Sequence, residues 1–405
     1  MTDRKLTRRD IARVVAAVPG LAVISISAPG RTQPKYPNPV KVGAVLNLSG
    51  PTAAQGNDFR AGLEFAAQQW NAKGGIGGSK IELLFEDHAA QPAKAVTAAQ
   101  KLIQVDGVKV LVNVYSSPVL AVSPIATKEK VLQISAGATS PRLVNISKYF
   151  MTSVANAALE VDVMLAFIKK KLDAKKLAII YSNDDFGLGI RDVAKAGWTS
   201  AGGMLVAEEG IEPGKADLGA VAAKVAGAKP DAVYVALSGA ALGSTVKNLR
   251  EAGYDGPIVS HQGYETPDLF SVAGSAIGKS YWTSAAQLVS AEGKAADEAF
   301  AAEFKKAFNR PPETYVRTHY DMAMSLFQAM DNLRKAGKEW TAENIRGALL
   351  ALGTVNGILG PFAYREDGTA LRELDIRSMI DGKPGVLMTA SQIEKDGIFS
   401  FKTGK

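Results

Sequence analysis

Residues 41–87 read KVGAVLNLSGPTAAQGNDFRAGLEFAAQQWNAKGGIGGSKIELLFED and decide the fold of this 405-residue chain. An apolar strand is followed by a loop rich in Gly, Pro and Ser, a long helix, a glycine turn and a second strand. This order is the βαβ unit that opens a doubly wound parallel sheet. The loop 49–56 follows the carboxyl end of a parallel strand, where such sheets bind ligands.

Strand and helix patterns continue to alternate along the chain. The expected strands are nearly continuous apolar runs, typical of parallel strands covered on both faces. They read VKVGAVLNL, SKIELLFED, VKVLVNVY, KVLQISA, KLAIIYS, DAVYVAL and GPIVSHQ. The helices expected between them span 59–72, 92–106, 159–172, 190–201, 218–226 and 244–252. The series from Val40 and the series from Lys176 share one layout, so the sequence predicts two lobes, each a doubly wound α/β sheet.

The pattern changes after Trp282. Three amphipathic helices are expected at 291–308, 320–336 and 341–351. A β-rich tail then begins at Gly360 and includes a hairpin with its turn at 381–384.

Composition excludes several classes of protein. The net charge of +7 falls to +4 without residues 1–30, and no basic patch stands out, so nucleic-acid binding is not expected. The absence of cysteine excludes disulfides, thiolate metal sites and a lipoprotein anchor. His88, His261 and His319 lack the spacing of metal ligands. With no phosphate-loop or nucleophile motif either, we expect no metal, no cofactor and no catalytic residues.

The first 30 residues have the form of an export signal. A basic start is followed by the uncharged run VVAAVPGLAVISISA, which is too short to span a bilayer as a mature helix. Thr7-Arg8-Arg9-Asp10-Ile11 resembles a twin-arginine signal, with a Sec leader as the alternative. We therefore expect a periplasmic protein, with 31–39 as an unstructured lead-in.

The sequence motifs of the opening segment are similar to those of one protein family. The matching identities lie in loops and turns: Gly50-Pro51-Thr52-Ala53, Gly56-x-Asp58, Asn71-Ala72-Lys73-Gly74-Gly75-Ile76 and Ile81-Glu82-Leu83. The chain thus resembles the periplasmic Leu/Ile/Val-binding proteins, the solute receptors of branched-chain amino acid ABC importers. The resemblance implies a type I periplasmic binding fold, hinge closure without covalent chemistry, an inner-membrane permease as partner, and a monomer.

The resemblance also implies domain boundaries. Three crossings between lobes are expected near 153–156, 281–284 and 360–361. Residues 40–155 with 283–360 would form lobe I, and 156–282 with 361–405 lobe II.

Two loops of lobe I are expected to hold the ligand's carboxylate. Ser116 follows the strand VKVLVNVY, where a helix N-terminus favours an anion, and the neighbouring Ser117 has the features of an N-cap. In the family the first serine of such a pair binds the carboxylate, and the alternative is that both serines only cap. By the same resemblance, Gly137, Ala138 and Thr139 would grip the ligand's main-chain groups.

Lobe II and the first loop are expected to shape the rest of the pocket. Phe186 stands where the family has an aromatic ring against the ligand, while Ser238 and Gln55 replace positions that are often aromatic. Gln262 stands where the amino acid binders carry an acid that neutralises the ammonium. Because a buried cation needs a charged partner, Gln262 favours a carboxylate without an essential ammonium. A shifted register, or a charge supplied by Asp185, is the alternative.

The sequence thus predicts a solute-binding receptor for a small carboxylate: an aromatic or branched acid, or an amino acid. A periplasmic amide or urea receptor or sensor of the same fold stays open. An exported α/β enzyme is the third possibility.

Overall fold

The structure is a computed structural model that describes residues 36–50, 52–214, 218–286 and 291–401. The predicted export signal, with its twin-arginine motif, lies outside the described residues. So do Pro51 of the first loop and most of the predicted lead-in.

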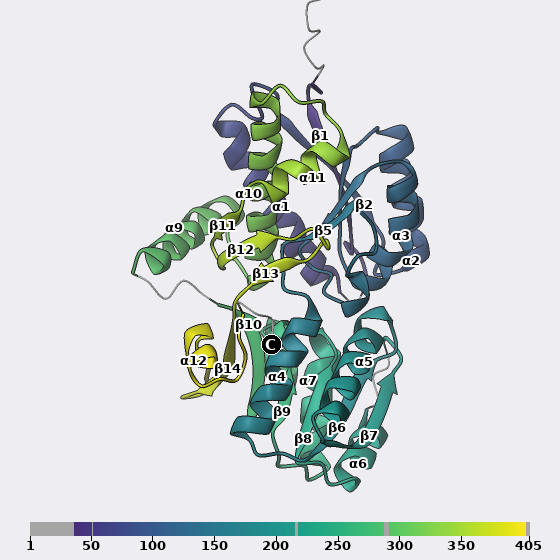
Figure 1. The fold of residues 1–405 in the computed structure, drawn as a ribbon, viewed down its shortest axis with the longest axis vertical. Helices are drawn as coiled ribbons and strands as arrows, with labels where there is room; N and C mark the ends of the chain where they lie inside the picture. The colour runs from purple at the N-terminus through teal and green to yellow at the C-terminus, as the bar shows by residue number, and fades with distance from the viewer. Residues whose placement is uncertain (1–35, 51, 215–217, 287–290, 402–405) are drawn as a thin grey trace, which may run out of the picture. The chain divides into compact units, whose positions relative to one another are not determined.

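The first sheet is parallel, with the strand order β2-β1-β3-β4-β5 (Figure 1). Its strands are β1 (Val40–Leu46), β2 (Ile81–Asp87), β3 (Val110–Asn113), β4 (Leu132–Ser135) and β5 (Phe150–Thr152). Strand β1 pairs with β2 on one side and β3 on the other, so the chain reverses its direction of winding between β1 and β3. This is the doubly wound sheet that the opening segment predicts.

Helices cover both faces of this sheet. On one face lie α1 (Ala53–Ala72), α10 (Thr314–Lys335) and α11 (Ala342–Leu350), so a late part of the chain returns to the first lobe (Figure 1). On the other lie α2 (Pro92–Gln100), extended by the π-helical turn η2 (Lys101–Val105), and α3 (Ser116–Lys128). Successive β1 side chains enter the two cores alternately, as the period of a strand requires.

The second sheet repeats this layout and extends it. The order is β15-β14-β10-β9-β8-β6-β7, and the five strands from β7 to β10 are parallel. These five are β6 (Lys176–Ser182), β7 (Met204–Ile211), β8 (Ala232–Ala236), β9 (Ile258–Ser260) and β10 (Ser280–Ala285). Here the winding reverses between β6 and β8. The two predicted doubly wound sheets are thus confirmed.

Two antiparallel strands complete the second sheet. They are β14 (Leu374–Ile380) and β15 (Lys383–Met388), the hairpin expected around residues 381–384, and β14 pairs with β10. The helices of this lobe are α4 (Ala157–Lys171), α5 (Asp185–Ser200), α6 (Gly219–Gly227), α7 (Gly239–Glu251), α8 (Pro267–Ala273) and α12 (Ala390–Lys395).

A third, small sheet lies between β10 and β14 in the sequence. It is formed by β11 (Thr354–Gly357), β12 (Gly360–Tyr364) and β13 (Ala370–Arg372), and it follows α9 (Ala291–Phe308) and α10. Phe362 and Tyr364 pack in the core of the first sheet. The lobe boundaries stay a prediction, but these contacts place a segment beyond residue 361 with the first lobe.

Several local expectations need correction. Ser117 does not cap α3: the helix begins at Ser116, its N-cap is Tyr115, and no side chain makes the capping bond. Helix α3 runs through Pro124 to Lys128. Helix α1 begins at Ala53, six residues before the predicted start. Strand β7 was not predicted because Glu208 and Glu209 interrupt its apolar pattern.

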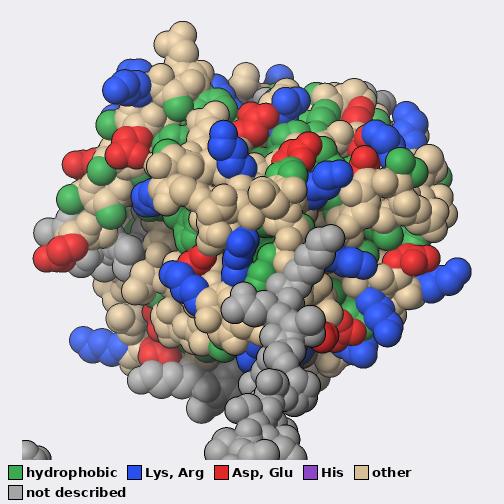
Figure 2. Space-filling model, turned by 90° about the horizontal axis from the view of Figure 1, so that it is seen from above, with side chains coloured by type: hydrophobic (Ala, Val, Ile, Leu, Met, Phe, Trp, Pro, Cys, Tyr) green, Lys and Arg blue, Asp and Glu red, His purple; other side chains and the backbone are tan. Residues whose placement is uncertain are grey.

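The surface carries both signs of charge. On the face seen in Figure 2, Lys and Arg side chains are interspersed with Asp and Glu, and the described residues there form no continuous patch of one sign. No helix in the described part of the chain is both long and apolar enough to cross a membrane. Those residues also contain no cluster of three acidic or histidine side chains placed to hold a metal ion.

Candidate ligand-binding site

The loops at the switch point of the first sheet meet through Gln55 and Tyr115. Gln55 lies in the first turn of α1, and Tyr115 precedes α3. The Tyr115 hydroxyl donates a hydrogen bond to Oε1 of Gln55. Burial raises the pKa of Tyr115 to about 12, so the phenol keeps its proton and remains the donor. Tyr115 also has φ of 61°, an uncommon conformation for a bulky residue that is enriched at functional sites.

Ser116 and Gly137 lie side by side at the ends of neighbouring strands. The backbone N–H of Ser140 donates to the Ser116 hydroxyl at 3.2 Å, and the N–H of Tyr115 donates to the carbonyl of Gly137 at 3.2 Å. A Cβ on Gly137 would stand 3.5 Å from the rings of both Phe59 and His319. The structure therefore brings the predicted carboxylate loops of lobe I together.

Ala138 and Thr139 have different surroundings. Ala138 is 1 % exposed and its side chain packs in a core cluster with Val119 and Phe150, so only its backbone can face a ligand. Thr139 is half-buried, and its carbonyl accepts from the N–H of Ala157 at 2.7 Å. Its hydroxyl makes no hydrogen bond within the part of the chain that the structure describes.

Sequence reasoning missed two side chains of α10 beside this wall, Tyr315 and His319. His319 stacks on Phe59 with ring centroids 4.4 Å apart, and Tyr315 meets the same ring edge-on at 5.2 Å. Burial raises the pKa of Tyr315, and the nearby Tyr115 and Glu160 add to the rise. These residues follow a crossing between the lobes, and their helical pattern carries no sign of this location.

The wall of lobe II begins with Phe186 and His261. Phe186, in the first turn of α5, packs edge-on against the His261 ring at 4.9 Å. The N–H of Gly263 donates to Nδ1 of His261, so that nitrogen carries no proton and Nε2–H donates to the carbonyl of Leu237 at 2.8 Å. Burial lowers the pKa of His261 to about 4, which keeps the ring neutral.

Gln262 is hydrogen-bonded to a buried carboxylate that the sequence did not predict. Its backbone N–H donates to Oε2 of Glu160 at 2.7 Å, and its side-chain Nε2 donates to Oε1 at 3.1 Å. Thr283 of β10 donates its hydroxyl to Oε2 at 2.6 Å. Burial raises the pKa of Glu160 to about 7, and the three hydrogen bonds partly offset the rise. We call Glu160, Gln262 and Thr283 the Glu160 cluster.

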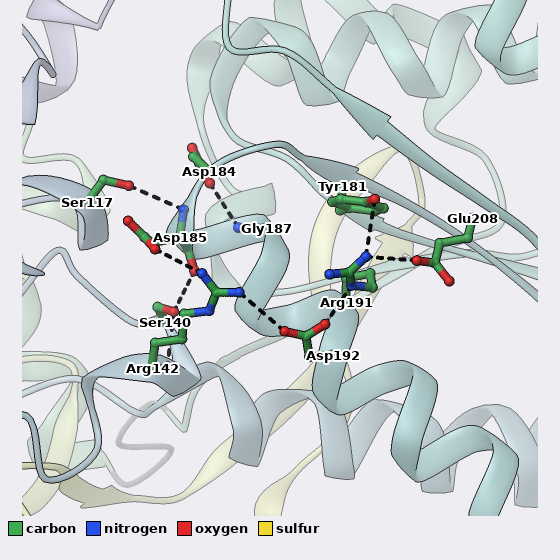
Figure 3. A network of polar contacts seen from close by, with 10 residues as sticks. All are labelled: Ser117, Ser140, Arg142, Tyr181, Asp184, Asp185, Gly187, Arg191, Asp192 and Glu208. Carbon is green, nitrogen blue, oxygen red and sulfur yellow. Dashed lines mark hydrogen bonds and ion pairs between the residues drawn. The ribbon is translucent and has the colours of Figure 1, made fainter.

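The two lobes touch at a second group of polar residues, which Figure 3 shows. The Ser140 hydroxyl donates to the carbonyl of Asp185 at 2.7 Å, and the N–H of Asp185 donates to the Ser117 hydroxyl at 3.2 Å. Arg142 pairs with Asp185 at 2.9 Å and with Asp192 at 3.3 Å. We call Ser117, Ser140, Arg142, Asp185 and Asp192 the closure cluster. Ser117 thus serves an interlobe contact instead of capping its helix.

Gln55 and Ser238 face each other less directly. The Nε2 atom of Gln55 lies 3.6 Å from the point where a Cβ would stand on Gly239, the residue after Ser238. Ser238 occupies the N-cap position of α7, is exposed, and makes no capping bond. The loop after β1 in the first lobe therefore approaches the loop after β8 in the second.

A small cavity lies where the chain passes between the sheets. Its volume is about 20 Å³, the room of one water molecule. It is lined by Val154, Gln262, Glu265, Ser284, Ala285, Thr314, Thr318, Leu359 and Arg372. Arg372 is buried, donates to the carbonyl of Leu359 at 3.1 Å, and has no partner for Nε within the described residues. Asp185, the alternative partner for an ammonium, is instead paired with Arg142.

Two doubly wound lobes whose strand-end loops meet define a two-lobed binding protein, and comparisons with known proteins specify the family. Residues 39–383 match the periplasmic binding protein family. A Leu/Ile/Val-binding protein of Rhizobium johnstonii is 28% identical over 81% of this chain and 88% of its own.

Solved structures share the fold. The substrate-binding protein of a branched-chain amino acid transporter from Streptococcus pneumoniae, in complex with isoleucine, is 25% identical with a TM-score of 0.75, over 87% of this chain and 100% of its own. A solute-binding protein of an ABC transporter from Rhodopseudomonas palustris, in complex with benzoate, is 22% identical with a TM-score of 0.75. The match covers 87% of this chain and 96% of its own.

The chain belongs to the periplasmic binding protein family, and it is similar to Leu/Ile/Val-binding proteins, as its sequence predicted. It is a solute-binding protein and not an enzyme. Its family places it in the periplasm.

Proposed function

We propose that this chain is the solute receptor of an ABC importer and that its ligand is a small carboxylate: an aromatic or branched acid, or an amino acid. One observation carries the proposal. The Ser116 hydroxyl, the backbone around Gly137 and Thr139, whose hydroxyl has no partner among the described residues, follow the carboxyl ends of β3 and β4, beside the N-terminus of α3. Hydroxyl and N–H donors at such a place suit an anion.

The ligand binds between the lobes in this proposal. The carboxylate sits on Ser116, Gly137, Ala138 and Thr139 of the first lobe, with Ala138 contributing backbone alone. Phe186, Ser238 and Gln262 of the second lobe close over the rest of the ligand, and Gln55 flanks it. Closure occurs at the hinge and involves no covalent step. The closed monomer then docks on an inner-membrane permease.

A thermal-shift panel tests the ligand class. The panel compares benzoate with benzamide, leucine with leucinamide, and includes isoleucine, valine and 4-methyl-2-oxopentanoate. A ligand present at 100 times its Kd stabilises the folded state by about 2.7 kcal/mol, which is a readily measured shift in Tm. We expect acids to stabilise the protein and their amides not to. Stabilisation by benzamide or urea but by no acid would instead establish an amide receptor.

A second comparison in the same panel tests the absence of an essential ammonium. Gln262 supplies no charge at the position where the family's amino acid binders carry an acid, so we expect aromatic or keto acids to bind. If leucine, isoleucine and valine stabilise the protein while these acids do not, that part of the proposal fails.

We also propose that residues 1–30 are an export signal, of the twin-arginine type because of Arg8 and Arg9. Replacing both arginines with lysine should retain the precursor in the cytoplasm. Unchanged export of that variant would indicate the Sec route.

A further inference from the structure

We propose that Glu160 is a positioning residue that turns the Gln262 side chain so that its carbonyl faces the cleft, and that the receptor therefore prefers carboxylates bearing a neutral hydroxyl donor. The inference rests on the proposed function, because it concerns the same ligand. It adds a chemical group that the ligand must carry.

The position of Glu160 requires a structural or binding role. Its side chain is fully buried, in the first turns of α4, and none of the described residues is a cationic partner for it. A carboxylate in such surroundings costs several kcal/mol of desolvation unless donors surround it. All three of its hydrogen-bond donors come from two cleft-side segments, Gln262 and Thr283.

The carboxylate determines how the amide of Gln262 is turned. Above pH 7 Glu160 is ionised and only accepts hydrogen bonds, so the amide must then present its NH₂ group to Glu160. The carbonyl oxygen of Gln262 then points away from Glu160. Gln262 lines the cavity between the sheets, and no described residue donates to its Oε1. The second lobe thus offers the ligand an acceptor of fixed direction.

Gln55 in the first lobe is turned in the opposite sense. The Tyr115 hydroxyl occupies its Oε1, so its NH₂ group is directed toward Gly239 of the other lobe. The two glutamines therefore have different roles: Gln55 offers a donor and Gln262 an acceptor. A ligand that satisfies both carries an acceptor, such as its carboxylate, and a donor elsewhere.

A hydroxyl suits the Gln262 carbonyl better than an ammonium does. The carbonyl is neutral, and the negative charge behind it already has three hydrogen-bond donors. A desolvated ammonium needs a charged group in direct contact. A hydroxyl needs only an acceptor. A ligand that lacks a hydroxyl leaves the buried Gln262 carbonyl unpaired, and this lowers its affinity.

The test uses four acids with one carbon skeleton, measured by calorimetry on the mature protein at pH 8, where Glu160 is ionised. They are 4-methylpentanoate, its 2-hydroxy and 2-oxo derivatives, and leucine, which differ only at carbon 2. Benzoate with 3- and 4-hydroxybenzoate forms a second series. In the wild type we expect the best hydroxy acid of a series to bind about tenfold more tightly than its parent, the value of one well-placed hydrogen bond.

Two variants identify Glu160 as the cause. In Glu160→Gln the new amide at position 160 can both donate and accept, so the Gln262 side chain is free to turn. The ratio of the affinity for the hydroxy acid to the affinity for its parent acid should then fall to about 1–2. Gln262→Leu removes the acceptor and should give the same ratio, which covers the case in which Glu160→Gln does not fold. Asp162→Asn changes an exposed acid of the same helix and should keep the wild-type ratio. A general loss of structure would weaken all ligands alike and leave the ratio unchanged.

Three results would overturn the inference. They are an equal affinity of wild type for hydroxy and parent acids, an unchanged ratio in both variants, and tighter binding of leucine than of its hydroxy acid. In each of these cases acids still bind, so the proposed function survives. If no acid binds the wild type, the proposed function fails and the inference fails with it.

Discussion

The Glu160 cluster and the closure cluster are built from similar side chains but differ in burial. Glu160 is fully buried and all its donors belong to the second lobe, whereas the Arg142 and Asp185 side chains are 39% and 35% exposed and connect the two lobes. Water screens an exposed ion pair, so it contributes about 0–1 kcal/mol, while a buried carboxylate depends on every donor it has. The first cluster therefore shapes one lobe, and we expect the second to adjust the balance between open and closed forms.

The largest effect is expected from removing the buried carboxylate. Glu160→Leu leaves the N–H and NH₂ of Gln262 and the Thr283 hydroxyl without an acceptor. Each unpaired group costs about 1–3 kcal/mol, so the free energy of unfolding should fall by more than about 3 kcal/mol. Urea denaturation measures this. Thr283→Val removes one donor only and should cost about 1 kcal/mol; equal costs for the two variants would contradict the role given to Glu160.

The next effect is a pH dependence with a defined sign. The folded-state pKa of Glu160, about 7, lies above the unfolded value of 4.5, so the folded protein holds this proton more tightly. The resulting stability is fully present below pH 4.5 and is lost as pH rises through 7, about 3 kcal/mol in all.

Urea midpoints at pH 5 and pH 8 check this sign. Glu160→Gln should lose less stability between the two than the wild type does. The histidines act in the opposite direction: burial lowers the pKa of His88 and His261 to about 4 and of His319 to about 3, so they destabilise the protein as pH falls below 6.5. Parallel pH curves for wild type and variant would exclude Glu160 as a titrating group.

A smaller effect is expected at the contact between lobes. A Cβ at position 189 of α5 would stand 2.6 Å from the Ser140 hydroxyl oxygen and 3.0 Å from Cδ of Pro141. Gly189→Ala should hold the lobes slightly apart and weaken the best ligand about tenfold, or about 1.4 kcal/mol, with little change in urea stability. Gly227→Ala in α6 adds a methyl group to open space and is the control. Unchanged affinity in Gly189→Ala would mean that binding does not need this closed contact.

The smallest effect belongs to the exposed ion pairs. Arg142→Gln breaks the contacts to Asp185 and Asp192, and we expect a two- to fivefold loss of affinity at low salt that shrinks at high salt. Arg60→Gln breaks a comparably exposed pair with Glu64 inside lobe I and should leave affinity unchanged. A loss that persists at high salt would show that Arg142 acts through something other than charge.

The sequence predicted what depends on local pattern. Apolar runs between helical segments located both sheets. The rule that ligand loops follow strand ends pointed to the loop at Ser116, and the family resemblance added Gly137 and Thr139. The strands were located from residues near one another in the chain, and the loop at Ser116 from the regular order in which parallel strands follow one another. The early start of α1 was missed because its first turn, AAQGND, has no apolar face.

The sequence could not predict contacts that closure and winding create. Glu160 lies in the run AALEVDVML, where a glutamate reads as a solvated helix face, and its partners lie 102 and 123 residues away. Ser117 was interpreted as a helix cap from its local sequence alone, because its actual partner, Asp185, is 68 residues distant. Because Gln262 is neutral, the sequence predicted no charged group at this position. The structure has a carboxyl group, that of Glu160, hydrogen-bonded directly to Gln262.

The close approach at Gly189 also has a consequence for signalling. A methyl group at position 189 would have no room beside the Ser140 hydroxyl, so we expect the lobes to stop at one separation whatever acid lies between them. Receptors with soft interfaces would close to a different degree around each solute. A membrane partner of the kind proposed above could therefore recognise occupancy as a single shape, and the identity of the cargo would be judged before docking and not during it.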